Sequence, residues 1–212
     1  MTGLAEKSEK TFKKWASHFD EDNWTWYFNH CYQTIYDLIG QEIHSESNIL
    51  DIGCGTGGLI RKVCQLNKKG KITGVESVAE MAERARERNV NNSNVEIINT
   101  SIESFQAIDQ YNIVFCVNVF HHLENPKEIL TKIRSLLASD GLFVYLDPFR
   151  DNIIRLAWEY LSKYLFFREP YIKYYQKNEL FQLFEETGYN ISKVKEILYV
   201  ILVCVLKKNE HV

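Results

Sequence analysis

The sequence lacks any cluster of basic residues and any long apolar run. Lys and Arg number 25 against 28 Asp and Glu, and the two signs are interspersed along the chain, which leaves a formal net charge of −3. Binding to nucleic acids normally requires gathered cations to neutralise phosphates, so we expect no DNA or RNA partner. The longest apolar run, residues 197–206, is too short to cross a bilayer, so no integral membrane association is expected.

Closely spaced cysteine pairs are also missing. The five cysteines are scattered and form no CxxC pair: Cys31, Cys54, Cys64, Cys116 and Cys204. Such spacing argues against a disulfide framework or a zinc site. No set of carboxylates with matching ligand spacing stands out either, so no metal is expected. Because the first 14 residues are polar and rich in lysine, unlike a secretory signal, a cytoplasmic protein is expected.

No linker, internal repeat or low-complexity tract divides the chain, which predicts a single domain over residues 1–212. From residue 48 onward, strand patterns alternate with helical patterns, which is typical of an α/β sheet with helices on both faces. We expect strands at 48–53, 71–76, 95–99, 111–117, 142–147, 189–197 and 198–207, and helices at 57–66, 78–89 and 126–138. The units of this domain are an N-terminal helical segment (8–45), a core of alternating strands and helices (48–147), a cap insertion with helical apolar spacing (152–175), and a closing helix with strands (177–207).

A glycine-rich turn, Gly53-Cys54-Gly55-Thr56-Gly57-Gly58, follows the first expected strand. Glycines permit positive φ angles and let a ligand approach the backbone closely. Glu76 closes the second expected strand, 25 positions after Asp51 (76 − 51). In doubly wound sheets an acid at this point accepts hydrogen bonds from ribose hydroxyls. The combination predicts a site for adenosine.

The same glycines, Gly53, Gly55 and Gly58, also satisfy the GxGxxG pattern of nicotinamide cofactor sites. Asp51 distinguishes the two interpretations. A carboxylate two residues before the first glycine would repel a pyrophosphate, whereas it would attract the sulfonium and α-amino group of S-adenosylmethionine. The methyl-donor interpretation is therefore favoured, and a nicotinamide oxidoreductase stays open as the alternative.

Residues 49–59 resemble the first motif of class I S-adenosylmethionine-dependent methyltransferases. The similarity extends over about residues 10–206 and includes 72–76, 94–105, 111–126 and 140–147. The subgroup it most resembles is small-molecule enzymes similar to those of ubiquinone and menaquinone biosynthesis. The resemblance implies a doubly wound, mostly parallel, seven-stranded Rossmann-like sheet of order 3-2-1-4-5-7-6 with strand seven antiparallel. It also implies S-adenosyl-L-methionine as the cofactor.

The resemblance and the turn together give a set of candidate cofactor-binding residues. They are Asp51, Gly53, Cys54, Gly55, Glu76, Ser77, Ser101, Ile102 and Asn118. One position departs from the family pattern, because many relatives carry an aspartate where this chain has Ser101. A serine hydroxyl and the backbone N–H of Ile102 would then have to recognise adenine with weaker contacts.

Methyl transfer from an activated donor depends mainly on positioning. A general base is needed only when the acceptor carries a proton at the operating pH. His121 and His122, in the loop after the fourth expected strand, are the candidate catalytic residues because histidine titrates near neutral pH. Solvated or packing roles remain the alternative for both, and the sequence does not decide which of them faces the site. Asp147 ends the fifth expected strand at the same edge.

Aromatic residues gather in the segments 15–28 and 158–175. They predict either packing or a two-part lid that supplies walls, through residues such as Trp158, for an apolar or aromatic acceptor. We therefore expect an enzyme that methylates a small, apolar or aromatic metabolite. A catalytically weak, methyltransferase-like binding protein is a further alternative, for which Ser101 is the hint. The oligomeric state stays open.

Overall fold

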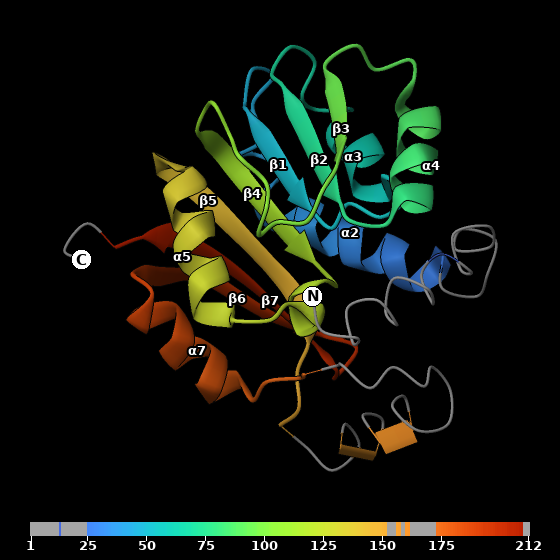
Figure 1. Ribbon diagram of the computed structural model, residues 1–212. Helices are drawn as coiled ribbons and strands as arrows, with labels where there is room; N and C mark the ends of the chain where they lie inside the picture. Colours follow the sequence, from blue (N-terminus) through green and yellow to red (C-terminus); the bar gives the residue numbers. More distant parts are fainter. Residues whose placement is uncertain (1–12, 14–24, 152–155, 158–159, 162–172, 210–212) are drawn as a thin grey trace.

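A seven-stranded mixed sheet forms the middle layer of the protein (Figure 1). The computed structural model describes residues 13, 25–151, 156–157, 160–161 and 173–209. The strands are β1 (Ile49–Ile52), β2 (Ile72–Glu76), β3 (Val95–Asn99), β4 (Tyr111–Val117), β5 (Leu137–Pro148), β6 (Tyr189–Ile197) and β7 (Ile201–Lys208). Their order is β3-β2-β1-β4-β5-β7-β6, and β7 runs antiparallel to both of its neighbours. The predicted sheet order and the antiparallel strand seven are confirmed.

Helices cover both faces of the sheet. They are α2 (Thr25–Ile39), α3 (Gly58–Val63), α4 (Ala79–Asn89), α5 (Pro126–Leu136) and α7 (Lys177–Glu186), with a short 3₁₀ helix, η1 (Phe120–His122). Along β4, Ile113 and Phe115 pack in the apolar cluster with α2, α3 and α4, while Val114 and Cys116 pack with α5 and α7. This alternation follows from the two-residue period of a strand. Because both faces are covered, β4 is apolar nearly throughout.

The fifth strand differs from the sequence-based prediction. A strand at 142–147 after a helix ending at 138 was expected, whereas α5 ends at Leu136 and β5 already begins at Leu137. Leu137 pairs with Tyr111, and the register then shifts before Ile113 pairs with Leu142. A Cβ at Gly141 would lie 3.0 Å from the carbonyl oxygen of Tyr111, so glycine lets the two strands approach. Asp140 and Gly141 therefore both lie within an irregular strand.

Two predicted segments are described only in part. The helical segment at 8–45 contains α2, while residues 1–12 and 14–24 lie outside the described residues. Most of the predicted cap at 152–175, Trp158 included, also lies outside them, so the lid stays a prediction. Among the described residues, no helix is both long enough and apolar enough to span a membrane.

The carboxyl ends of β1, β2, β4 and β5 meet at one edge of the sheet because these strands are parallel. Four polar side chains lie at or just beyond these ends: Asp51, Glu76, Asn118 and Asp147. Three of them are buried, with exposed fractions of 3% for Asp51, 8% for Glu76 and 0% for Asp147. Doubly wound sheets bind their ligands at this edge.

Candidate functional site

The glycine turn between β1 and α3 is held in a left-handed conformation. Gly53, Gly55 and Gly57 have φ angles of 64°, 53° and 77°. A Cβ on Gly53 would lie 2.4 Å from Cγ2 of Val119, so the turn packs directly against the residue that follows Asn118. A Cβ on Gly55 would meet no atom within 4 Å. The turn therefore presents open backbone to the sheet edge at Gly55 and is tightly packed at Gly53.

Glu76 joins the end of β2 to the glycine turn. Its Oε2 accepts a hydrogen bond from the N–H of Gly55 at 2.9 Å, and its Oε1 accepts one from the N–H of Val78 at 2.8 Å. Burial raises the pKa of the Glu76 carboxyl, while these backbone hydrogen bonds partly offset that shift. The acid and the turn, predicted as two halves of one site, are in direct contact.

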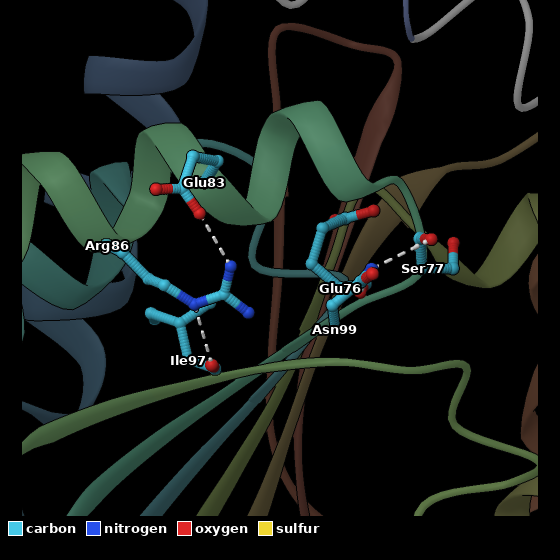
Figure 2. A network of polar contacts seen from close by, with 6 residues as sticks. All are labelled: Glu76, Ser77, Glu83, Arg86, Ile97 and Asn99. Atoms are coloured by element: carbon cyan, nitrogen blue, oxygen red, sulfur yellow. Dashed lines mark hydrogen bonds and ion pairs between the residues drawn. The ribbon is translucent and has the colours of Figure 1, made fainter.

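Asn99 supports the backbone on which Glu76 lies. Figure 2 shows its side chain at the end of β3, where Nδ2 donates to the carbonyl oxygen of Ser77 at 3.0 Å and to that of Glu76 at 2.8 Å. On the neighbouring helix, Arg86 donates to Glu83 at 2.9 Å and to the carbonyl oxygen of Ile97 at 3.2 Å (Figure 2). Sequence reasoning assigned Asn99 no role, because such backbone support depends on strand register.

Asp51 is buried beneath the turn. Burial, and secondarily the negative charge of Glu76, raises the pKa of the Asp51 carboxyl to about 8. The sequence-based choice between S-adenosylmethionine and a nicotinamide cofactor assumed that Asp51 is charged. In the free protein it instead holds its proton through most of the neutral range, and a cation placed nearby would favour its ionised form.

The other residues predicted to contact adenosine make fewer polar side-chain contacts than Glu76. Cys54 is buried, and its Sγ would lie 2.8 Å from a Cβ on Gly74, so its thiol points into the core and leaves only its backbone for a ligand. Ser101 lies in a turn after β3, where its hydroxyl accepts a weak hydrogen bond from the N–H of Ser104 at 3.4 Å. The Ile102 side chain belongs to the apolar core. Ser77 is exposed beside Glu76.

Asn118 follows β4 and has a φ angle of 57°, which is rare for residues other than glycine. Its Oδ1 accepts a hydrogen bond from the hydroxyl of Tyr27 at 2.7 Å, although the two residues are 91 positions apart. Burial raises the pKa of Tyr27 well above its usual value, so this hydroxyl stays protonated. The helix α2 therefore contributes a side chain to the candidate site; the sequence offered the aromatic segment 15–28 as packing or as part of a lid, but not this contact.

His121 and Asp147 are joined by two contacts at the same edge. The Oδ2 of Asp147 accepts the backbone N–H of His121 at 2.9 Å, and its Oδ1 lies 2.6 Å from the ring Nδ1. The rings of His122 and Tyr174 lie against the His121 ring, with centroid distances of 3.9 and 5.3 Å. From the sequence, Asp147 was expected only to end the fifth strand at the same edge as the two histidines. The signal for this pair was that each residue lies at or just beyond the end of an adjacent parallel strand.

Comparison with known proteins places this chain in a family. The model of a family described as a methyltransferase domain matches residues 24–194. The chain belongs to this methyltransferase family. It is 35% identical over 105 residues to (S)-coclaurine N-methyltransferase of Thalictrum flavum subsp. glaucum, covering 48% of this chain and 28% of that protein. It is 26% identical over 162 residues to ubiquinone biosynthesis O-methyltransferase of Rickettsia bellii, covering 73% and 66%. The chain thus spans just over a quarter of the length of the first relative and about two thirds of the length of the second.

Solved structures support the same fold. A structure described as the DhpI-SAM-HEP complex superposes with a TM-score of 0.77 at 20% identity and covers 98% of this chain and 99% of that one. The DhpI-SAH complex gives a TM-score of 0.76 at 17% identity, with 98% of both chains covered. The class I methyltransferase fold, expected from the resemblance, is confirmed. The family match also decides against the nicotinamide oxidoreductase.

Methyltransferases of this class use S-adenosylmethionine, and the residues of this methyltransferase fit that donor. The open backbone at Gly55 leaves room for a ligand beside the Glu76 carboxylate. Asp51 and Glu76 form a pair of buried acids, and desolvation raises the pKa of each. Such a pair favours a cationic ligand, which would lower the energy of the ionised acids, over a pyrophosphate.

We expect the affinity for S-adenosylmethionine to rise with pH up to about 8 and then to level off, relative to an Asp51→Asn variant. Below the pKa of Asp51, binding of a cation releases the proton of this carboxyl. Each unit by which the pH is decreased should therefore weaken affinity by up to about tenfold. Calorimetry across this range measures the effect. The ratio of wild-type to variant affinity cancels the titration of the ligand, and a flat ratio would show that Asp51 is not linked to binding.

Proposed function

We propose that this methyltransferase transfers a methyl group from S-adenosylmethionine to a small, apolar or aromatic molecule. Aromatic side chains around the carboxyl end of β4 carry the proposal. The Tyr27 hydroxyl reaches Asn118 from α2, and the Tyr174 ring lies against His121 from the segment before α7. Phe120 of η1 packs against Tyr145 and Tyr175 in the apolar core, which fixes the loop that carries His121. Apolar and aromatic surfaces of this kind line small-molecule sites.

Named residues would hold the donor in this proposal. Glu76 would accept the ribose hydroxyls, Ser101 and the backbone of Ile102 would face the adenine, and Asp51 and Asn118 would face the methionine end. The donor supplies an electrophilic methyl group. The acceptor would then lie between Tyr27 and Tyr174, beyond the end of β4.

Relatives and charge also favour a small acceptor. The names of similar proteins specify coclaurine, pavine and ubiquinone biosynthesis, while one other names malonyl-[acyl-carrier protein]. The formal net charge of −3, with no gathered basic residues, does not favour a nucleic acid.

The test combines ligand binding with product analysis. We expect S-adenosylmethionine and S-adenosylhomocysteine to bind in calorimetry, and NAD and NADP not to bind. With methyl-labelled donor and a cell extract separated by size, label should appear in the small-molecule fraction. Micromolar binding of a nicotinamide cofactor without any response to the sulfonium donor would overturn the assignment. Label confined to protein or nucleic acid would overturn the small acceptor alone.

A further inference from the structure

The His121–Asp147 pair has the geometry of an oriented general base. Asp147 is fully buried and uses both carboxylate oxygens on one residue, with Oδ2 on the backbone and Oδ1 on the ring of His121. A carboxylate at Nδ1 fixes the tautomer that carries its proton there. The lone pair of a neutral His121 is then on Nε2, at the opposite edge of the ring. Nε2 has no hydrogen-bond partner among the described residues, and 10% of the side chain stays exposed.

The surroundings of Asp147 leave its charge available to His121. Four neighbouring side chains are acids whose pKa values are raised by burial and further by the charge of Asp147: Tyr27, Cys31, Cys116 and Tyr145. All four stay neutral near pH 7, and for Cys31 the pKa rises to about 11. The imidazole of His121 is the bonded partner that can take up a positive charge. An imidazolium formed there would have a carboxylate oxygen at hydrogen-bond distance.

The elements packed around His121 add no competing charge that the structure describes. His122 from η1 and Tyr174 from the segment before α7 contact the ring, and Lys173 contacts His121 through its backbone N–H, which donates to the His121 carbonyl at 3.0 Å. The Lys173 ammonium instead lies 4.7 Å from the centre of the Tyr175 ring. His121 is thus held by Asp147, two rings and one backbone contact.

Building on the proposed function, we propose that His121 is the catalytic base, that Asp147 is its positioning residue, and that the acceptor is a protic nucleophile, a hydroxyl or an amine. An acceptor that is already a carboxylate needs no base. Such an anion would also be repelled by the negative charge of Asp147. The pairing therefore specifies an acceptor that must lose a proton during methylation.

The proposed step balances as follows for a hydroxyl acceptor. The O–H bond breaks and its proton passes to Nε2 of His121, while an oxygen lone pair forms the new bond to the methyl carbon. The methyl–sulfur bond breaks with its electron pair on sulfur, which leaves S-adenosylhomocysteine. Asp147 holds the imidazolium until its proton returns to solvent. An amine acceptor follows the same course with nitrogen in place of oxygen.

Three aromatic probes that differ in the reacting group test the acceptor class: phenol, benzylamine and benzoate. We expect His121→Gln to lower turnover of phenol or benzylamine by about 100-fold or more, the usual share of a general base. Turnover of benzoate should change by less than about threefold, and so should the affinity for S-adenosylhomocysteine. Asp147→Asn should follow the same pattern, because an amide favours the wrong tautomer. The control His44→Gln, at an exposed histidine between α2 and β1, should change none of these values by more than about threefold.

A spectroscopic measurement tests the pair without turnover. Nitrogen NMR of the imidazoles should show the neutral His121 protonated at Nδ1 in the wild type and shifted toward Nε2 in Asp147→Asn. A neutral wild-type His121 protonated on Nε2 would overturn the proposal. If none of the three probes is methylated, the NMR result alone tests the proposal. Equal losses for phenol and benzoate, or turnover of benzoate alone, would also overturn it while leaving methyl transfer intact. Failure of S-adenosylhomocysteine to bind would overturn the proposed function instead.

Discussion

Replacing Gly53 with alanine is expected to cause a large loss of stability. With a φ of 64°, the position is strained for any residue with a side chain, and the new methyl group would lie 2.4 Å from Cγ2 and 2.7 Å from Cγ1 of Val119. Left-handed strain costs about 1–2 kcal/mol and overpacking about 1–3 kcal/mol, so the free energy of unfolding should fall by about 2–4 kcal/mol. Urea denaturation measures this change.

Gly55→Ala is the matched control for this prediction. Its φ of 53° imposes similar strain, yet its added methyl group would meet no atom within 4 Å. It should therefore lose only about 1–2 kcal/mol of stability while filling the space where the donor approaches. Combining Gly53→Ala with Val119→Ala should restore part of the stability. Equal losses in the two single variants would show that the contact with Val119 does not matter.

Replacing Glu76 with alanine is expected to weaken binding of S-adenosylmethionine and S-adenosylhomocysteine strongly. The carboxylate would be lost as an acceptor for the ribose hydroxyls, and hydrogen bonds to a charged group contribute about 1.5–3 kcal/mol each. Affinity for S-adenosylhomocysteine should fall by at least about tenfold, or ~1.4 kcal/mol. The N–H groups of Gly55 and Val78 would also lose their acceptor, so the turn itself becomes less fixed.

Glu83→Ala is the control for Glu76→Ala. Glu83 lies on the neighbouring α4, where its largely exposed carboxylate pairs with Arg86 at 2.9 Å (Figure 2). An exposed pair contributes little, so donor affinity should stay unchanged in this variant. Calorimetry on both variants, with circular dichroism to confirm folding, gives the comparison. Unchanged affinity in a folded Glu76→Ala protein would mean that the adenosine binds elsewhere.

The geometry of the proposed donor half of the site was predictable because its signals are local. A strand, a glycine turn and a helix follow one another without interruption between Ile49 and Val63. Glu76 ends the next strand, and parallel pairing of β1 with β2 brings it to the turn, as the alternation of elements predicts. The order of the whole sheet came from resemblance to a family, since short apolar strands do not specify their partners. The start of β5 was misplaced because a bulge depends on the neighbouring strand.

The contacts at the proposed acceptor end of the site were decided by tertiary structure. The Tyr27–Asn118 contact joins residues 91 positions apart. His121, which follows β4, contacts Asp147 near the end of the adjacent β5, 26 positions later. No local pattern specifies which histidine turns toward the carboxylate. Burial likewise decides that Asp51, an ordinary acid in the sequence, holds its proton up to a pH of about 8. The sequence determined the strand–turn–helix unit through backbone preferences and periodicity, whereas desolvation and contacts between distant side chains exist only once the sheet has formed.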